Sequence, residues 1–334
     1  MSRAQLTSTV EQSSGGVVAP FLAGKNKIIN GDFAISQRGN SFSQPTGYTL
    51  DRWTVGYYDA YPTTVSISQQ AFTPGSAPVA GYEAPYFARC AITTVGSTTV
   101  FEAFVQKIEN VQTLAGQTAT LSFWAKGDSS RTAAGIIVGQ AFGTGGSSFV
   151  SSYITSTYSV TSTWTRYSYT FTVPSIAGKT IGAGSSLNIY FRVPVASGAT
   201  TDIWGVQLEA GSVATPFTTA SGTLQGELAL CQRYFCTIGQ EEAWGQLYST
   251  TDVMLWFKFP VAMRIAPTAT YPSLTNAIDR VGSSNGTPTS LGTNIVTANN
   301  IMIIGHGMAA GTAYMPAAWY GNAGANLIQI SAEL

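Results

Sequence analysis

The sequence predicts an all-β protein: a jelly-roll β-sandwich, a short linking helix and a smaller C-terminal β-sandwich domain. Stretches with period-two alternation and β-branched residues recur along the chain, separated by Gly, Pro, Ser and Asn. Only 10% of the 334 residues are charged, against roughly 25% in ordinary soluble domains. Gly, Ser, Thr and aromatic residues take the place of the missing charges, and this composition favours strands and turns.

Four segments follow from this pattern. Residues 1–25 are small and polar, which predicts an extended N-terminal arm that attaches to another surface. Residues 26–220 hold most of the alternating stretches and form the predicted jelly roll. Residues 221–238 contain the linking helix, and residues 239–334 form a second β domain with a terminal strand and many turns.

The jelly roll is expected to contain nine strands. In the stretch TATLSFWAKG, Leu121 and Phe123 point to one face while Ser122 and Trp124 point to the other, so each face carries a ring. The segment NKIINGDFAISQRGNSF should begin the first strand, with Ile28 on the core side. The predicted strands cover residues 27–36, 51–58, 63–72, 86–94, 118–127, 134–142, 165–173, 186–195 and 201–211.

One helix is expected over residues 223–235. Leu224, Leu228, Cys231 and Phe235 recur at spacings of four, three and four, which gives one apolar stripe. This stripe is too short for an independent coiled coil. The helix therefore marks a domain junction.

Charge and cysteine content exclude several classes of function. The 16 basic and 16 acidic residues cancel, and no basic run could follow a phosphate backbone, so we expect no nucleic-acid partner. No stretch reaches the roughly 20 apolar residues of a membrane span, and the first residues lack a signal-peptide core, so we expect cytoplasmic synthesis without membrane insertion. The three cysteines have no metal-like spacing and are predicted to be buried thiols. Weak charge repulsion favours self-association.

The ionisable residues argue against an enzyme. His306 is the only histidine, and no motif places a nucleophile and an orienting carboxylate beside it. Glu241 and Glu242 are adjacent, so on a strand they would point to opposite faces rather than across a cleft. We therefore expect no catalytic residues.

Several stretches in order resemble one family. They are NKIINGDFAISQRGNSF, GYTLDRW, VQKIENVQTLAGQTATLSFWAKG, WGVQLEAGSVATPF, GELALCQRYF, FPVAMRIAPTAT and a terminal SAEL. Together they look like bacteriophage tail-fibre and virion-appendage proteins with a carbohydrate-binding-module-like jelly roll. The resemblance spans about residues 26–334 and leaves the arm outside.

The resemblance implies a virion structural protein, commonly a homotrimer, that contacts polysaccharide on the host cell surface. Other virion proteins would be bound through residues 1–25. Two alternatives stay open: a purely architectural capsid, neck or tail decoration protein, and a capsule-degrading glycoside hydrolase. Neither the host nor the sugar can be predicted from the sequence.

Glycan binding requires aromatic faces that stack on sugar rings, with amides and hydroxyls beside them. Two ring-rich stretches are the predicted contact surfaces, WTVGYYDAYP in the first domain and AYMPAAWYGNAGAN in the second, with EAWGQLYS beside the latter. The predicted glycan-binding residues are Trp319, Tyr320, Tyr314, Trp244, Tyr248, Trp53, Tyr57 and Tyr58.

No cofactor is predicted, but a structural Ca²⁺ has a candidate site. Jelly-roll modules of the family that the chain resembles often hold calcium through one carboxylate near the first strand and another near the last. Asp32 and Asp202 occupy those places, and carboxylate oxygens are the ligands that Ca²⁺ prefers. The alternative is that Asp32 accepts turn hydrogen bonds and Asp202 caps a strand.

Overall fold

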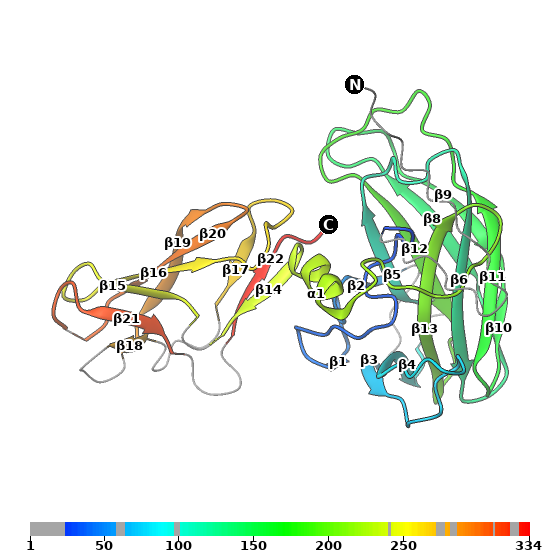
Figure 1. The fold of residues 1–334 in the computed structure, drawn as a ribbon, viewed down its shortest axis with the longest axis horizontal. Helices are drawn as coiled ribbons and strands as arrows, with labels where there is room; N and C mark the ends of the chain where they lie inside the picture. The colour runs from blue at the N-terminus through cyan, green and yellow to red at the C-terminus, as the bar shows by residue number, and fades with distance from the viewer. Residues whose placement is uncertain are drawn as a thin grey trace, which may run out of the picture.

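The fold is a pair of β-sandwiches joined by one short helix, which confirms the predicted fold class (Figure 1). The computed structural model describes residues 24–57, 64–96, 101–239, 242–271, 278–280, 286–309, 311–320 and 327–334. Among them, α1 (Leu224–Gln232) is the only α-helix, and it is neither long nor apolar enough to cross a membrane.

The first sandwich packs a six-stranded sheet against a five-stranded one, and all strand pairs are antiparallel. The six-stranded sheet runs in the order β1 (Ser41–Ser43), β3 (Thr64–Ala71), β4 (Tyr86–Thr94), β13 (Ala199–Ala210), β6 (Thr118–Gly127), β11 (Thr165–Thr172). The five-stranded sheet runs in the order β2 (Trp53–Tyr57), β5 (Phe101–Glu109), β12 (Ser186–Val193), β8 (Ile136–Ala141), β9 (Val150–Thr155). A small ribbon pairs β7 (Arg131–Ala133) with β10 (Tyr158–Val160).

Side-chain alternation decides which residues lie between the sheets. On β6, Leu121 and Phe123 are fully buried in the main core, and the Phe123 ring meets that of Phe191 from the opposite sheet at 5.1 Å between centroids. Trp124 points the other way and joins a separate cluster on the outer face. The predicted two-faced pattern of this strand is confirmed.

The segment from residue 26 to 38 is scaffold, as expected, but the predicted strand over 27–36 is wrong. Ile28 and Phe33 are fully buried, yet the backbone between them turns. Asn30 and Phe33 both have φ of 57°, in the left-handed region that strands cannot use. The Asn30 amide then stabilises the turn by donating to the carbonyls of Ile35 and Asp51.

Helix α1 is locked onto this turn. Thr223 caps it by accepting from the Gly226 amide, and the buried carboxylate of Glu227 accepts from the backbone N–H groups of Asn30 and Ser221. The helix ends three residues before the predicted end because Phe235 already begins the next strand. In Figure 1 the helix lies between the two sandwiches.

The second sandwich packs a three-stranded sheet against a six-stranded one around a core that includes Leu255, Ile303 and Ile330. The small sheet runs in the order β14 (Phe235–Ile238), β22 (Ile328–Ser331), β17 (Thr268–Thr270). The larger one runs in the order β18 (Ile278–Arg280), β21 (Pro316–Trp319), β15 (Trp244–Leu247), β16 (Val253–Lys258), β20 (Asn300–His306), β19 (Ser290–Val296). All three cysteines are buried free thiols, as predicted.

A buried ion pair joins the two sandwiches. The Glu333 carboxylate binds the guanidinium of Arg52 and accepts from Arg38 Nη2 at 3.0 Å. Both arginines also stack on rings at the start of the second sandwich, Arg52 on Tyr234 at 3.4 Å and Arg38 on Phe235 at 3.5 Å from the centroid. The Arg52 side chain is only 1% exposed, so its charge depends on Glu333 for neutralisation.

Glu333→Gln should therefore destabilise the junction by about 3 to 5 kcal/mol, the usual cost of leaving a buried charge without its partner. Thermal and urea unfolding would measure the loss. Glu83→Gln, at an exposed carboxylate, is the matched control and should change stability by less than about 0.5 kcal/mol. Equal stability of the two variants would contradict the role given to Glu333.

Candidate functional site

Two of the predicted glycan-binding residues are buried, so the prediction is wrong for them. Trp53 packs against Phe33 and Phe191 in the first core and is 0% exposed. Trp319 is 0% exposed in the second core, because it lies on the inward face of β21 rather than in a tip loop. Neither ring can stack on a sugar.

The other predicted rings are scattered. Tyr314 and Trp244 are 73% and 52% exposed, and Tyr248 and Tyr320 are half-buried, but no ring contact joins any two of them among the described residues. Tyr57 lies on β2, and its side chain and Tyr58 fall outside the described residues. These residues stay individual predictions and do not form a described site.

The five-stranded sheet of the first sandwich presents a row of side chains on its outer face. Tyr190 on β12 lies opposite Ile137 on β8, which in turn lies opposite Tyr153 on β9. Phe149, just before β9, meets the Tyr190 ring edge-on at 6.5 Å. Phe149 and Tyr153 are 52% and 57% exposed, so this aromatic platform of Phe149, Tyr153 and Tyr190 is open to solvent.

A chain of polar groups runs beside the platform along β12. The Ser186 hydroxyl donates to Asn188 Oδ1 at 2.8 Å, and Asn188 Nδ2 donates to the Tyr190 hydroxyl at 3.0 Å. The Arg192 guanidinium donates to the Tyr153 hydroxyl at 3.2 Å and to Glu102. Alternation explains the arrangement, since every second residue of SLNIYFRV faces outward.

Glycine at position 139 makes room for the platform. Gly139 lies on β8 between the rings, and a Cβ there would come within 2.5 Å of the Phe149 ring and 2.9 Å of the Tyr190 ring. Any larger side chain would push at least one ring away. The platform therefore depends on a residue that contributes no contact of its own.

Electrostatics keep this face neutral but polar. Burial raises the pKa of Glu102, and the adjacent Arg192 opposes that rise by binding the carboxylate. Burial also raises the pKa of the Tyr190 hydroxyl, which keeps it a hydrogen-bond donor at neutral pH. The Ser186, Asn188 and Arg192 side chains are themselves buried, so this polar chain supports the exposed rings from beneath.

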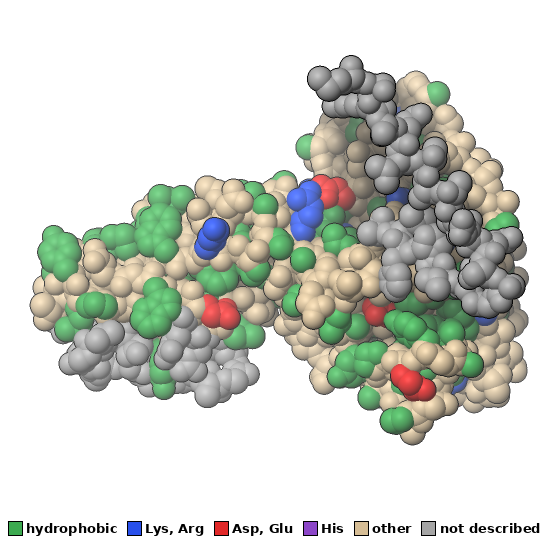
Figure 2. All heavy atoms as spheres, viewed as in Figure 1, with side chains coloured by type: hydrophobic (Ala, Val, Ile, Leu, Met, Phe, Trp, Pro, Cys, Tyr) green, Lys and Arg blue, Asp and Glu red, His purple; other side chains and the backbone are tan. Residues whose placement is uncertain are grey.

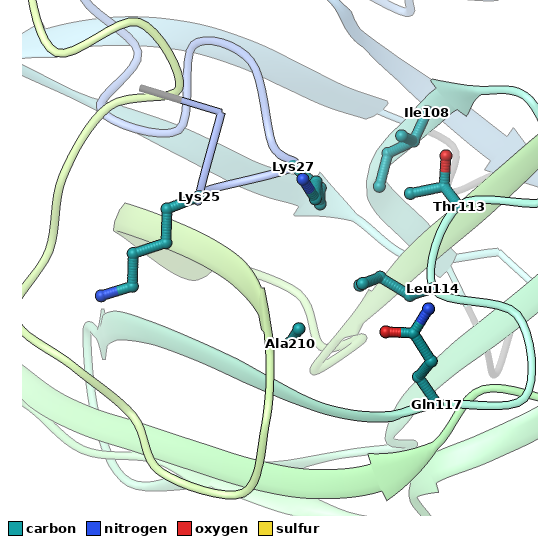
Figure 3. A pocket seen from close by; sticks show the side chains of 7 residues that line it. All are labelled: Lys25, Lys27, Ile108, Thr113, Leu114, Gln117 and Ala210. Atoms are coloured by element: carbon teal, nitrogen blue, oxygen red, sulfur yellow. The ribbon is translucent and has the colours of Figure 1, made fainter. Parts of the chain in front are cut away.

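Apart from the platform, the same sandwich has a cavity of about 520 Å³ (Figure 3). It contains no ring, and its two cations are already bound. Lys25 pairs with Glu209 at 3.2 Å, and Lys27 donates to the Gly24 carbonyl. Nothing in this cavity favours a sugar. Its lining residues are Lys25, Lys27, Ile108, Thr113, Leu114, Gln117 and Ala210.

The structure gives His306 a carboxylate partner that the sequence did not reveal. His306 Nδ1 lies 3.2 Å from Asp252, and Ser249 donates to the other oxygen of that carboxylate at 2.9 Å. These bonds lower the pKa of Asp252. Ser249 binds the aspartate and not the imidazole, so the three residues do not have the order of a catalytic triad.

Asp32 and Asp202 do not share a site. The Asp202 carboxylate is bound by Arg89 at 2.6 and 2.8 Å and lies 3.7 Å from Lys126, so cations already neutralise it. Asp32 lies beside Glu227 at the helix, and burial together with that neighbour raises its pKa to about 6. The predicted shared calcium site is therefore wrong. The described residues contain no group of three or more metal-ligating side chains.

Asp32→Asn should stabilise the protein at pH 7 by up to about 3 kcal/mol, because one pKa unit corresponds to about 1.4 kcal/mol. Between pH 4 and 6 the folded state keeps a proton that the unfolded chain has lost, so stability falls as the pH rises through this range. At pH 4 the variant should match the wild type. Urea unfolding between pH 4 and 7 measures the stability of the wild type and of the variant. The same dependence of stability on pH in the two proteins would contradict the raised pKa of Asp32.

No known family model matches the chain, and no curated protein sequence matches it. Solved structures resemble just over half of it. The CBM22-1 xylan-binding domain from Paenibacillus barcinonensis is 14% identical, with a TM-score of 0.31, over 52% of this chain and 94% of that domain. A putative sugar-binding protein from Bacteroides thetaiotaomicron is 13% identical, with a TM-score of 0.34, over 56% of this chain and all of that one.

The enzymatically active domain of tailspike protein 4 from bacteriophage CBA120 is 18% identical, with a TM-score of 0.33. That similarity covers 56% of this chain and 22% of the tailspike chain. With TM-scores below 0.5 and identities below 20%, none of these similarities assigns a function to the chain.

Proposed function

We propose that the chain is a glycan-binding protein and that the aromatic platform on the five-stranded sheet is its binding surface. The observation that supports this is the combination of two exposed rings and a third, half-buried one, whose hydroxyl is held in place by a buried hydrogen-bonded polar chain. Sugar rings have an apolar C–H face and a polar rim, and they need both kinds of partner.

The geometry suits an extended polysaccharide better than a small ligand. The platform crosses three neighbouring strands, and the polar chain follows one strand at right angles to that row. A sugar stacked on Tyr153 would place its hydroxyls near the Tyr190 hydroxyl. Such open sites bind weakly alone, so several copies in one assembly would raise the effective affinity.

We further propose that the chain is part of a bacteriophage fibre or appendage and carries out no catalysis. The ordered sequence stretches that resemble tail-fibre proteins support the first statement. The arrangement of Ser249, Asp252 and His306, which lacks a serine–histidine contact, supports the second. Gold-labelled antibody on purified virions would test the location, and release of reducing ends from host polysaccharide would contradict the absence of catalysis.

The outer face of the C-terminal sandwich supports self-association, and we propose that the assembly is a homotrimer. Trp244 and Trp256 lie opposite each other on β15 and β16, and the same row continues through Met302 to Ile295. Trp256 is 44% and Ile295 43% exposed, so the row carries apolar side chains into solvent. Figure 2 shows hydrophobic side chains spread over the surface of this module, at the left of the view.

Tyr153→Ala should weaken binding to an array of bacterial surface polysaccharides by about tenfold, the effect of losing one stacked ring. Gly139→Ala should weaken binding similarly by displacing Phe149 and Tyr190. Tyr86→Ala removes an exposed ring from the opposite sheet of the same sandwich and is the matched control. If Tyr153→Ala and Gly139→Ala bind as the wild type does, the platform is not the binding surface. If the wild type binds no polysaccharide, the architectural alternative is favoured.

Trp256→Ser should shift the protein from trimer toward monomer, because it removes the largest exposed apolar group near the centre of the row. Light scattering at micromolar concentration measures the mass. Tyr314→Ala serves as control and should stay trimeric. A monomeric wild type would contradict the proposal directly.

A further inference from the structure

The six-stranded sheet of the first sandwich carries a partly open cavity of about 320 Å³ on its outer face. Because the two sheets face each other across the core, this cavity opens on the side opposite the aromatic platform. Its volume lies at the lower end of the range of small-molecule sites, roughly 300 to 1,000 Å³. The lining residues are Val79, Tyr82, Trp124, Arg166, Trp204, Pro216 and Phe217.

Four rings from separate segments form its walls. The Trp204 ring lies 5.2 Å from Trp124, 5.1 Å from Phe217 and 5.7 Å from Tyr82, measured between centroids. Gly205 follows Trp204 with φ of 65°, and a Cβ there would come within 2.8 Å of the Trp124 ring. The backbone is therefore shaped so that the two tryptophans can approach.

One wall carries a buried hydrogen-bond donor without an acceptor. Trp204 is 1% exposed, and its indole Nε1–H has no partner among the described residues. A buried donor left unpaired costs about 1 to 3 kcal/mol. An acceptor atom on a ligand in the cavity would remove that cost.

Arg166 supplies a positive charge that forms no ion pair with a carboxylate among the described residues. Its guanidinium lies over the Trp124 ring at 4.7 Å, and its Nη2 donates to Ser122 and Thr215. Its Nη1 and Nε atoms donate to no described residue. The nearby Glu209 is bound by Lys25, Gln207 and Thr215 instead.

An arginine that does not pair with a carboxylate is unusual in this molecule. Of the arginines whose side chains the structure describes, all but Arg166 and Arg264 pair with a carboxylate. Arg264 instead donates to the carbonyls of Ala332 and Glu333. Arg166 is thus the described arginine best placed to bind an anion from outside the chain.

We propose that this cavity binds one carboxylate-bearing sugar ring, a uronic acid unit of an acidic glycan. The sugar's C–H faces would lie against the aromatic walls, its carboxylate would accept from Arg166, and a ring or hydroxyl oxygen would accept from Trp204 Nε1–H. The choice of a sugar rests on the proposed glycan-binding function. The cavity, however, shares no residue with the aromatic platform and lies on the opposite face of the sandwich.

Calorimetric titration of the full chain with methyl glucuronide and with methyl glucoside tests the proposal, since the two probes differ in the carboxylate. The glucuronide should bind at least tenfold more tightly. Arg166→Gln should remove that preference, and Trp204→Phe, which keeps a ring but loses the N–H, should weaken binding of both probes. Arg131→Gln, at an arginine paired with Asp128, is the matched control and should bind as the wild type does.

Equal affinity for the two probes, no binding of either, or an unchanged preference in Arg166→Gln would each overturn the proposal. Preferential binding of an aromatic acid such as indole-3-acetate would also overturn it. Thermal unfolding of Arg166→Gln, at an exposed residue, should match the wild type and so exclude misfolding as the cause of a loss. Tyr153→Ala should leave glucuronide binding unchanged, which separates this site from the platform.

Discussion

Side-chain alternation along the strands is the constraint on which the rest of the structure depends. Each strand of the first sandwich points one set of side chains toward the core and the other toward an outer face, so a two-layer protein has two outer faces of independent chemistry. On β12 the outward set is Ser186, Asn188, Tyr190 and Arg192, and it builds the platform. On β6 and β13 it includes the tryptophans of the cavity. Neither face needs to disturb the core that both share.

Much of the fold follows from the sequence because alternation is a local signal. The strands at 86–94 and 118–127 were predicted to the residue, and the helix to within three positions at its end. β5 was missed because FEAFVQKIE is buried on both sides over most of its length and has no period of two. The strand predicted at 27–36 is absent because Asn30 and Phe33 adopt left-handed backbone conformations, which apolar patterning does not reveal.

The functional surfaces could not be predicted in the same way, because exposure is a property of the assembled sheets. Trp53 and Trp319 stand in ring-rich stretches, yet both lie on inward faces. Conversely, Phe149 and Tyr190 are 41 positions apart and meet only because β9 and β12 both pair with β8, where Gly139 leaves room for the two rings. Alternation in the sequence separates the two faces of β12, but it does not reveal which aromatic rings from other strands lie next to its outward side chains. The same holds for the cavity, whose walls come from four segments.

The contact between Glu333 and Arg52 joins residues 281 positions apart in the chain. This contact holds the end of the second sandwich, just after its last strand, against the first sandwich. Arg38 binds the same carboxylate. A buried pair of this kind has a narrow range of allowed geometries, unlike a flexible linker. A mechanical force applied to the C-terminal sandwich would therefore be transmitted to the first sandwich through this contact instead of being absorbed by bending between them.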